Sequence, residues 1–246
     1  MLFLGDSLMR EQYTDLIRRF GFNNSLDEMF HGHDLMDRSL CQKANSPYLW
    51  LRVVRNGPTR FRRMKQVIST FRGNIIVANI GVHYTPGDDF GKFMDRLISW
   101  LRHWQDTALA CHAKSRTGMS PCLVIWKTSV PGHPNCKDFA QPSSNVTEME
   151  ALVANPMLYN NKAEYKKYGW WAMKYHNRIA EQKFAESNLT YAIMDAYALH
   201  ILRPDQHFSE RHDCLHNKEM TKQLVLGQML LHLLKAWGRG LLDGHV

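Results

Sequence analysis

The 246-residue sequence contains no run of eighteen apolar residues, so we expect no membrane-spanning segment within it. No secretory signal peptide is visible, because the chain opens directly on the apolar segment Leu2-Phe3-Leu4. The sequence also has no internal repeat and no convincing linker, and it contains only nine prolines and fifteen glycines. A chain of this length that is 44% hydrophobic can bury one substantial core, so we expect a single domain over residues 1–246.

The cysteines form no CxxC pair, which argues against a zinc ribbon or a thioredoxin-like site. Three N-x-[ST] sequons are present, at Asn23, Asn145 and Asn188. Together, these features favour the lumen of the secretory pathway, such as the Golgi, or secretion, with one or two disulfides and one cysteine left over. We expect the natural chain to extend upstream of residue 1, where any membrane anchor would lie. The five cysteines are Cys41, Cys111, Cys122, Cys136 and Cys214.

Negative charge is in the minority, since the formal net charge is +8 and thirteen histidines can add to it in acid. A basic balance favours acidic partners such as an anionic polysaccharide, a nucleic acid or a membrane surface. The simpler interpretation is a solvated basic surface. The basic residues are scattered, and the densest run, residues 60–65, is too short for a nucleic-acid-binding arm. We therefore expect no nucleic-acid partner.

Apolar runs alternate with longer amphipathic segments along the chain, which predicts alternating strands and helices. The strand candidates are near-continuous apolar runs, as is typical of parallel strands that are buried on both faces. The element order predicts an α/β fold, a three-layer α/β/α sandwich with a mostly parallel sheet. The predicted strands are residues 2–4, 48–54, 74–79, 122–127 and 191–194, the predicted helices are residues 8–20, 88–110, 163–186 and 219–237, and residues 131–161 are predicted to be irregular.

The first group of candidate residues is Gly5-Asp6-Ser7, directly after the first predicted strand. Functional groups of an α/β sheet gather at the carboxyl ends of its strands, and Ser7 stands there at the start of a helix. The free N–H groups of a helix N-terminus would stabilise an oxyanion, and Gly5 permits the tight turn before it. Ser7 is therefore a candidate nucleophile. The alternative is that Asp6 or Ser7 only caps the helix.

A second group stands near the end of the sequence, in His212-Asp213-Cys214-Leu215-His216. A nucleophilic serine needs a base, and the base needs an orienting carboxylate. Asp213 and His216 are three residues apart, and on a turn leading into the last helix they can lie side by side. Two alternatives remain: Asp213 caps the helix while His216 is a surface residue, or both bind a metal ion together with His212. Because no further ligand set is evident from the spacing, we expect no metal and no cofactor.

Four more residues are candidates for substrate binding. The amide of Asn79 and the N–H of Gly81, at the end of a predicted strand, are suitable oxyanion donors, with ordinary turn chemistry as the alternative. Arg10 lies one helical turn after Ser7, so it can face the same site and bind the acyl carbonyl or an anionic group, unless it is a surface arginine. His133, in the loop after another strand, is a candidate substrate contact.

Taken together, these residues resemble the PC-esterase group of the SGNH (GDSL) hydrolase superfamily. That group includes the plant trichome-birefringence-like polysaccharide O-acetyltransferases and related sialic-acid O-acetyltransferase domains. Its GDSxxR block is similar to residues 5–10, and its DCxH-type block is similar to residues 213–216. Residues 79–84 resemble its Asn-x-Gly-His-Trp strand end, and residues 126–133 resemble its Trp-Arg-Thr-x-x-Pro-x-His segment. After His216, Asn-Lys-Glu-Met replaces the Trp-Cys-Leu-Pro of the plant enzymes, so a plant xylan-type substrate does not follow.

The resemblance implies an SGNH-like catalytic domain and a mechanism. Ser7 would attack an acyl ester, with His216 as general base and Asp213 orienting it. An acyl-enzyme would then pass its acyl group to a sugar hydroxyl, as a carbohydrate O-acetyltransferase, or to water, as an acetylesterase. A catalytically silent glycan-binding relative is the alternative from another class, and the intact Ser7, Asp213 and His216 argue against it. The implied partners are an acyl donor and a carbohydrate acceptor. A disulfide between Cys136 and Cys214 would tie the irregular segment to this site.

Overall fold

The structure is a computed structural model in which the described residues are 1–6, 8, 9, 12, 38–40, 51–55, 61–82, 84, 90–112, 121–159, 169–208, 213–217 and 225–239. Ser7, Arg10 and His212 lie outside these residues, as does most of the predicted helix over residues 8–20.

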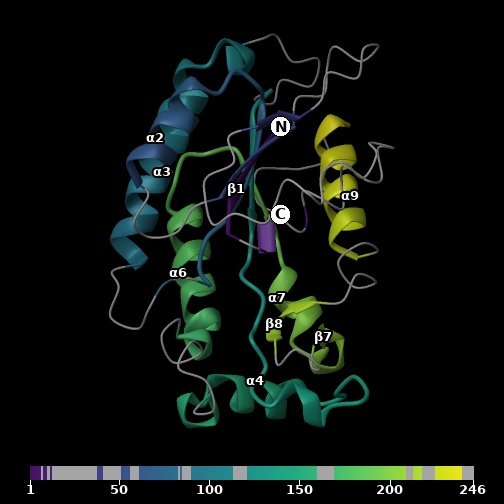
Figure 1. The fold of residues 1–246 in the computed structure, drawn as a ribbon. Helices are drawn as coiled ribbons and strands as arrows, with labels where there is room; N and C mark the ends of the chain where they lie inside the picture. Colours follow the sequence, from purple (N-terminus) through teal and green to yellow (C-terminus); the bar gives the residue numbers. More distant parts are fainter. Residues whose placement is uncertain are drawn as a thin grey trace.

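A six-stranded sheet forms the centre of the described part of the chain (Figure 1). Its strand order is β2-β3-β1-β4-β5-β6, and every neighbouring pair is parallel except the edge pair of β2 and β3. The prediction of an α/β fold with a mostly parallel sheet is therefore confirmed. The strands are β1 (Leu2–Gly5), β2 (Arg38–Leu40), β3 (Leu51–Arg55), β4 (Ile75–Asn79), β5 (Leu123–Lys127) and β6 (Tyr191–Met194).

The order in which successive strands are added to the sheet reverses at β1. The chain places β3 on one side of β1 and β4 on the other, so the strand order reverses there. In open parallel sheets, ligands bind outside the carboxyl ends of the strands at such a reversal. Here those ends are Gly5 of β1 and Asn79 of β4, which are direct register partners.

Helices lie on both sides of the sheet. Figure 1 shows α2, α3 and α6 on one side and α9 on the other. The helices are α2 (Phe61–Thr70), α3 (Phe90–Thr107), α4 (Val146–Ala154), α6 (Met173–Ala185), α7 (Ala196–His200) and α9 (Gly227–Gly238). Short 3₁₀ turns are η3 (Leu109–His112), η4 (Cys136–Asp138), η5 (Pro156–Tyr159), η6 (Trp170–Ala172) and η7 (Pro204–Gln206).

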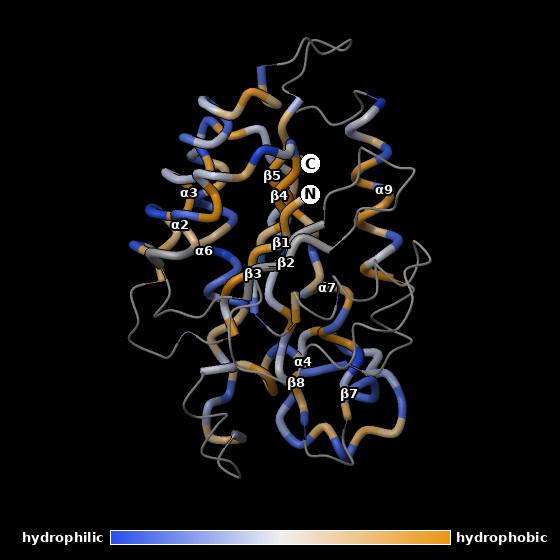
Figure 2. The backbone as a smooth tube through the Cα atoms, turned by 45° about the horizontal axis from the view of Figure 1, so that its top comes forward, coloured by the Kyte–Doolittle hydropathy of each residue, from blue (hydrophilic) through white to orange (hydrophobic). Residues whose placement is uncertain are grey.

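Each face of the sheet contributes to its own hydrophobic core, because side chains alternate between the faces along a strand. In β1, Leu2 and Leu4 belong to the core that contains α2 and α3 residues, whereas Phe3 belongs to the core that contains Leu230 of α9. Figure 2 shows the hydrophobic strands β1, β4 and β5 in the middle of the molecule, with polar positions toward the outside. The continuous apolar runs in the sequence follow from this burial on both faces.

Two helices differ from the sequence-based expectation. Helix α2 was not predicted, although its buried residues Met64, Val67 and Ile68 follow helical spacing, because the basic residues around it mask the pattern. Helix α4 lies inside residues 131–161, so the prediction that this whole segment is irregular was wrong. Its start is stabilised locally by the side chain of Asn145, which accepts a hydrogen bond from Glu148 N–H.

The predicted helix over residues 163–186 is also too wide in its described part, because α6 begins at Met173, after the turn η6. The predicted starts at residues 163 and 219 lie outside the described residues. The predicted strand over residues 191–194 is confirmed as β6. Helix ends are the least certain part of a sequence-based prediction, because local capping decides them.

Two disulfides join cysteines of the described residues, Cys111–Cys122 and Cys136–Cys214. The expected pairing of Cys136 with Cys214 is thereby confirmed. Two disulfides are consistent with a lumenal or secreted protein. Within the described ranges, no helix combines the length and the apolar character needed to cross a bilayer.

Candidate functional site

The carboxyl ends of β1 and β4 meet at Gly5 and Asn79, and the backbone is closely packed there. A Cβ atom added to Gly5 would lie 2.5 Å from Cβ of Met9 and 2.6 Å from the carbonyl oxygen of Asn79. Because these distances are shorter than real Cβ contacts, only glycine fits. Gly5 thus lets the chain turn tightly from β1 into the segment that carries Ser7.

Asp6 is buried just beyond this turn, with 1% of its surface exposed. One carboxylate oxygen accepts a hydrogen bond from Leu8 N–H at 3.0 Å, which is a capping contact. The other oxygen has no hydrogen-bond partner among the described residues. Asp6 therefore stabilises the turn around Ser7, and the predicted roles of Ser7 and Arg10 remain predictions because both lie outside the described residues.

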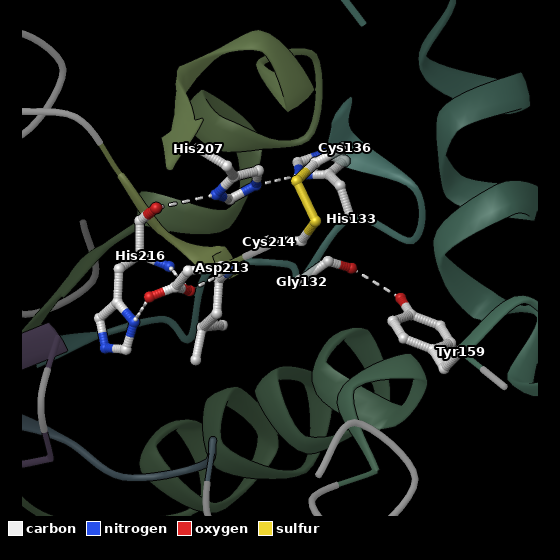
Figure 3. The surroundings of a disulfide bond; sticks show 9 residues. Gly132, His133, Cys136, Tyr159, His207, Asp213, Cys214 and His216 are labelled. Carbon is white, nitrogen blue, oxygen red and sulfur yellow. Dashed lines mark hydrogen bonds and ion pairs between the residues drawn. A yellow bond between two sulfur atoms is a disulfide. The ribbon is translucent and has the colours of Figure 1, made fainter. Parts of the chain in front are cut away.

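Asp213 and His216 lie in contact, as the catalytic interpretation requires. Oδ2 of Asp213 is 2.7 Å from Nδ1 of His216 (Figure 3). The two residues belong to strand β8 (Asp213–Asn217), which pairs with β7 (His207–Phe208), so the expected turn into a helix was wrong. The register shifts between His207 and Phe208, and this irregularity allows residues three apart to approach each other.

Asp213 also fixes the backbone that carries His216. Its Oδ1 atom accepts hydrogen bonds from the N–H groups of Leu215 at 3.1 Å and His216 at 3.0 Å. Burial raises the pKa of Asp213, but the hydrogen bond and charge of His216 and these two N–H groups outweigh it and lower the pKa to about 2. Asp213 is thus a carboxylate at neutral pH that orients the imidazole of His216. Both side chains keep some exposure, 26% for His216 and 34% for Asp213.

The segment that carries these two residues is attached to the main sheet at several points. The Cys136–Cys214 disulfide joins β8 to η4, and His133 N–H donates to the carbonyl of Cys214 at 2.9 Å (Figure 3). The hydroxyl of Tyr159 donates to the carbonyl of Gly132 at 2.6 Å, which anchors the same loop. These contacts place β8 beyond the carboxyl end of β5, the strand from which that loop departs.

Hydrogen bonds continue from this loop to the end of β4. The amide of Asn79 donates to the carbonyl of Lys127 at 2.8 Å and to the hydroxyl of Ser129 at 3.2 Å. The backbone of Ser129 exchanges two hydrogen bonds with the side chain of Asn177 on α6, at 2.8 and 2.9 Å. The Gly5–Asn79 edge and the Asp213–His216 pair therefore lie at the same carboxyl side of the sheet.

This arrangement changes the expected role of Asn79. Both hydrogens of its amide are engaged by Lys127 and Ser129, so the amide does not present an oxyanion donor in this structure. The turn-chemistry alternative describes Asn79 better. Gly81 remains a candidate donor, because its N–H makes no hydrogen bond to the described residues. A side chain at Gly81 would collide with the hydroxyl of Ser129, so its backbone does approach closely.

The expectation that His133 contacts the substrate is corrected. His133 is fully buried, and its two ring nitrogens lie 2.6 Å from Nε2 of His207 and 2.9 Å from the carbonyl of Ile201. No part of its ring is free to meet a ligand. His207, which sequence reasoning missed, bridges His133 to the carbonyl of His216. Its sequence context, Gln-His-Phe after a short turn, carries no motif that would have marked it.

The metal interpretation finds no support in the described part of the chain, where no group of three or more histidine, cysteine, aspartate or glutamate side chains could hold an ion. His212 lies outside that part. The imidazole of His216 instead uses Nδ1 for Asp213, which fits a general base.

Comparison of the chain with protein-family models finds no match, and comparison with curated proteins finds none either. The similarity to the PC-esterase group therefore rests on the motif residues themselves.

Proposed function

We propose that the protein is a serine-dependent carbohydrate O-acetyltransferase that acts through an acyl-enzyme on Ser7. The observation that carries the proposal is the 2.7 Å contact between Asp213 and Nδ1 of His216. An imidazole that donates Nδ1–H to a carboxylate keeps Nε2 free of a proton, and this is the form that accepts a proton from a serine hydroxyl. The pair also lies at the carboxyl side of a parallel sheet, where active sites gather.

The proposed reaction has two steps. First, Oγ of Ser7 bonds to the acyl carbon of the donor ester while Nε2 of His216 takes the serine proton. The donor alcohol then leaves with that proton. Second, a sugar hydroxyl gives its proton to Nε2 of His216 and bonds to the acyl carbon. The bond between the acyl carbon and Oγ of Ser7 then breaks, and His216 returns the proton to Oγ. The negative charge of each tetrahedral intermediate would be stabilised by Gly81 N–H and by the free N–H groups after β1.

The charge on Asp213 supports this cycle. The low pKa of Asp213 keeps it ionised, so it can stabilise the imidazolium that forms when His216 takes a proton. Arg10 is assigned to binding of the acyl carbonyl or of an anionic substrate group, because its spacing of three residues from Ser7 corresponds to about one turn of the helix predicted there.

We further propose that the fold is a three-layer sandwich of the SGNH type in the secretory pathway, in the Golgi or outside the cell. The helices on both sides of the sheet and the reversal of strand order at β1 support the fold. The two disulfides support an oxidising compartment. The proposed partners are an acyl donor and a carbohydrate acceptor, with no nucleic acid and no cofactor.

The experiment incubates the protein with p-nitrophenyl acetate and a mixed set of oligosaccharides, and follows phenol release and sugar acetylation. Phenol release and sugar acetylation should both be lost in Ser7→Ala and His216→Ala. They should remain in the control Ser69→Ala, which removes an exposed serine on α2. Phenol release without sugar acetylation would assign the protein as an esterase. Glycan binding with no acyl chemistry would identify a silent relative and contradict the mechanism.

A further inference from the structure

A fully buried pair of histidines lies directly behind the proposed base. His133 comes from the loop after β5 and His207 from β7, and both have none of their surface exposed. Nδ1 of His133 is 2.6 Å from Nε2 of His207, and the rings lie 4.9 Å apart between centroids. Figure 3 shows this contact between the disulfide and the Asp213–His216 pair. Neither ring can reach a substrate, so the proposed reaction does not use them directly.

Each end of this pair meets a backbone carbonyl. Nε2 of His133 is 2.9 Å from the carbonyl of Ile201, and Nδ1 of His207 is 3.1 Å from the carbonyl of His216. A carbonyl only accepts, so each of these two contacts needs a hydrogen on the ring nitrogen. The contact between the rings needs a third hydrogen. Two neutral imidazoles carry only two N–H hydrogens, so one proton is missing unless the pair is charged.

The distances indicate which contact lacks its hydrogen in the neutral pair. Two bare nitrogens would repel each other at 2.6 Å, so the hydrogen between the rings must be present. The contact to Ile201, at 2.9 Å, is shorter than the contact to His216, at 3.1 Å. We therefore assign the missing hydrogen of the neutral pair to the contact with His216, which is the longest of the three.

We propose that His133 and His207 are a positioning pair for His216, which hold its backbone carbonyl fully only after they take up one shared proton. The proton added to Nδ1 of His207 completes the third hydrogen bond, and the positive charge is shared through the hydrogen between the rings. The proposal deepens the function proposed above, since the positioned residue is the proposed base. Its structural part, the proton count, holds independently of catalysis.

The titratable groups around the His133–His207 pair shift the pKa values of the two rings in opposite directions. Burial lowers the pKa of His133 to about 4 and that of His207 to about 3, so the pair is neutral at pH 7. The charge of Asp205, on η7, favours proton uptake by His133, and Asp213, on β8, favours it at His207. His200, on α7, and His133 itself oppose uptake at His207. The pair therefore takes one proton in acid.

The first test measures the ring protons directly. Protein labelled with ¹⁵N in histidine and ¹³C in backbone carbonyls, in the Ser7→Ala form, is titrated from pH 7 to pH 3 by NMR, which spans the lowered pKa values of both histidines. We expect Nδ1 of His207 to be bare at pH 7 and protonated at low pH, with the carbonyl signal of His216 moving in the same step. A protonated Nδ1 on His207 throughout, or no hydrogen between the rings, would overturn the proposal. The result does not depend on activity, so it stands whether or not the protein is an acyltransferase.

Two substitutions of His207 separate its two contacts. The amide of His207→Asn can donate from the position of Nδ1 at every pH, so the carbonyl signal of His216 should stay at its acidic value. The amide of His207→Gln reaches the position of Nε2 and donates only to His133, so the signal should stay at its neutral value. The control His200→Asn replaces another buried histidine, whose Nδ1 donates to the carbonyl of Ala196 at 2.7 Å. It should keep the coupled step in the His207 Nδ1 and His216 carbonyl signals and move that step to higher pH, because one group that opposes proton uptake at His207 is removed.

Activity provides the second readout. At one fixed pH, we expect kcat of His207→Asn to exceed that of His207→Gln on the order of threefold to tenfold, because small displacements of a catalytic group lower the rate strongly. KM should differ little between them, since neither ring touches substrate. Equal kcat values, or a His216 carbonyl signal that titrates as in the parent protein in both variants, would contradict the positioning role. If a variant fails to fold, the titration of the parent protein still decides the proton count.

Discussion

Removal of the Cys136–Cys214 disulfide should both destabilise the fold and lower the activity of the proposed base. The bond joins the strand that carries Asp213 and His216 to the loop after β5, and both sulfurs are buried. The double substitution Cys136→Ala with Cys214→Ala leaves the backbone hydrogen bond from His133 to Cys214 as a remaining tie. We expect β8 to shift, and His216 with it.

The size of the stability change follows from the length of the closed loop. The two cysteines are 78 residues apart, so loop-closure entropy predicts a loss of about 4.5 kcal/mol in the free energy of unfolding. The Cys111–Cys122 bond closes a loop of only 11 residues, for which the same relation predicts about 3 kcal/mol. The Cys111–Cys122 bond lies at the opposite, amino end of β5, after α3 in the chain. Its removal therefore provides a control with a comparable loss in the free energy of unfolding.

The assay combines urea unfolding with kcat for p-nitrophenyl acetate, measured per folded molecule. We expect kcat to fall at least about tenfold without the Cys136–Cys214 bond, since the base loses its position, and to change less than about twofold without the Cys111–Cys122 bond. Equal kcat values in the two variants, or a smaller stability loss for the longer loop, would refute the reasoning.

Three further predictions follow from the same geometry. Asp213→Asn should lower kcat/KM by about 10³- to 10⁴-fold with little change in fold, whereas Asp205→Asn, a nearby aspartate paired with Arg203, should keep kcat/KM within a few-fold in the same assay. The buried His133, His200 and His207 have pKa values lowered by burial to about 4, 4 and 3, so the unfolded chain binds more protons below pH 6.5 and stability falls as pH falls toward 4. Three such groups make the free energy of unfolding, measured with urea, change by on the order of 4 kcal/mol per pH unit. The substitution His200→Asn should reduce this slope by about a third, and an unchanged slope would contradict the prediction. Gly5→Ala should lower the free energy of unfolding by about 1–3 kcal/mol in thermal unfolding, because its Cβ would lie 2.5 Å from Cβ of Met9. The control Gly238→Ala, which has open space around it, should cause no measurable loss, and equal effects would contradict the packing argument.

Much of the sheet could be predicted from the sequence, because strands buried on both faces appear as continuous apolar runs. Residues 74–79, 122–127 and 191–194 coincide with β4, β5 and β6 within one residue at either end. Helix α2 was missed because its apolar stripe is interrupted by basic residues on the solvent side. Helix α4 was missed because its start depends on the cap by Asn145, while the surrounding prolines suggested a loop.

The pairing of Asp213 with His216 could be anticipated from residue types and spacing alone, but its local structure could not. The carboxylate of Asp213 accepts hydrogen bonds from the N–H groups of Leu215 and His216, which holds the pair on the irregular strand β8. The sequence periodicity does not indicate this strand. Asn79 and His133 were expected to face a substrate because of their polar chemistry. Both side chains instead satisfy buried carbonyls, and such long-range partners are set by the tertiary fold.

Trapping the acyl-enzyme tests the central claim most directly. The protein is mixed with p-nitrophenyl acetate, quenched in acid within one turnover, digested and analysed by mass spectrometry. We predict the mass of one acetyl group on the peptide that contains Ser7, with less of it in His216→Ala and none in Ser7→Ala. An acetyl group on another residue, or acyl transfer that proceeds at the full rate in Ser7→Ala, would contradict the account.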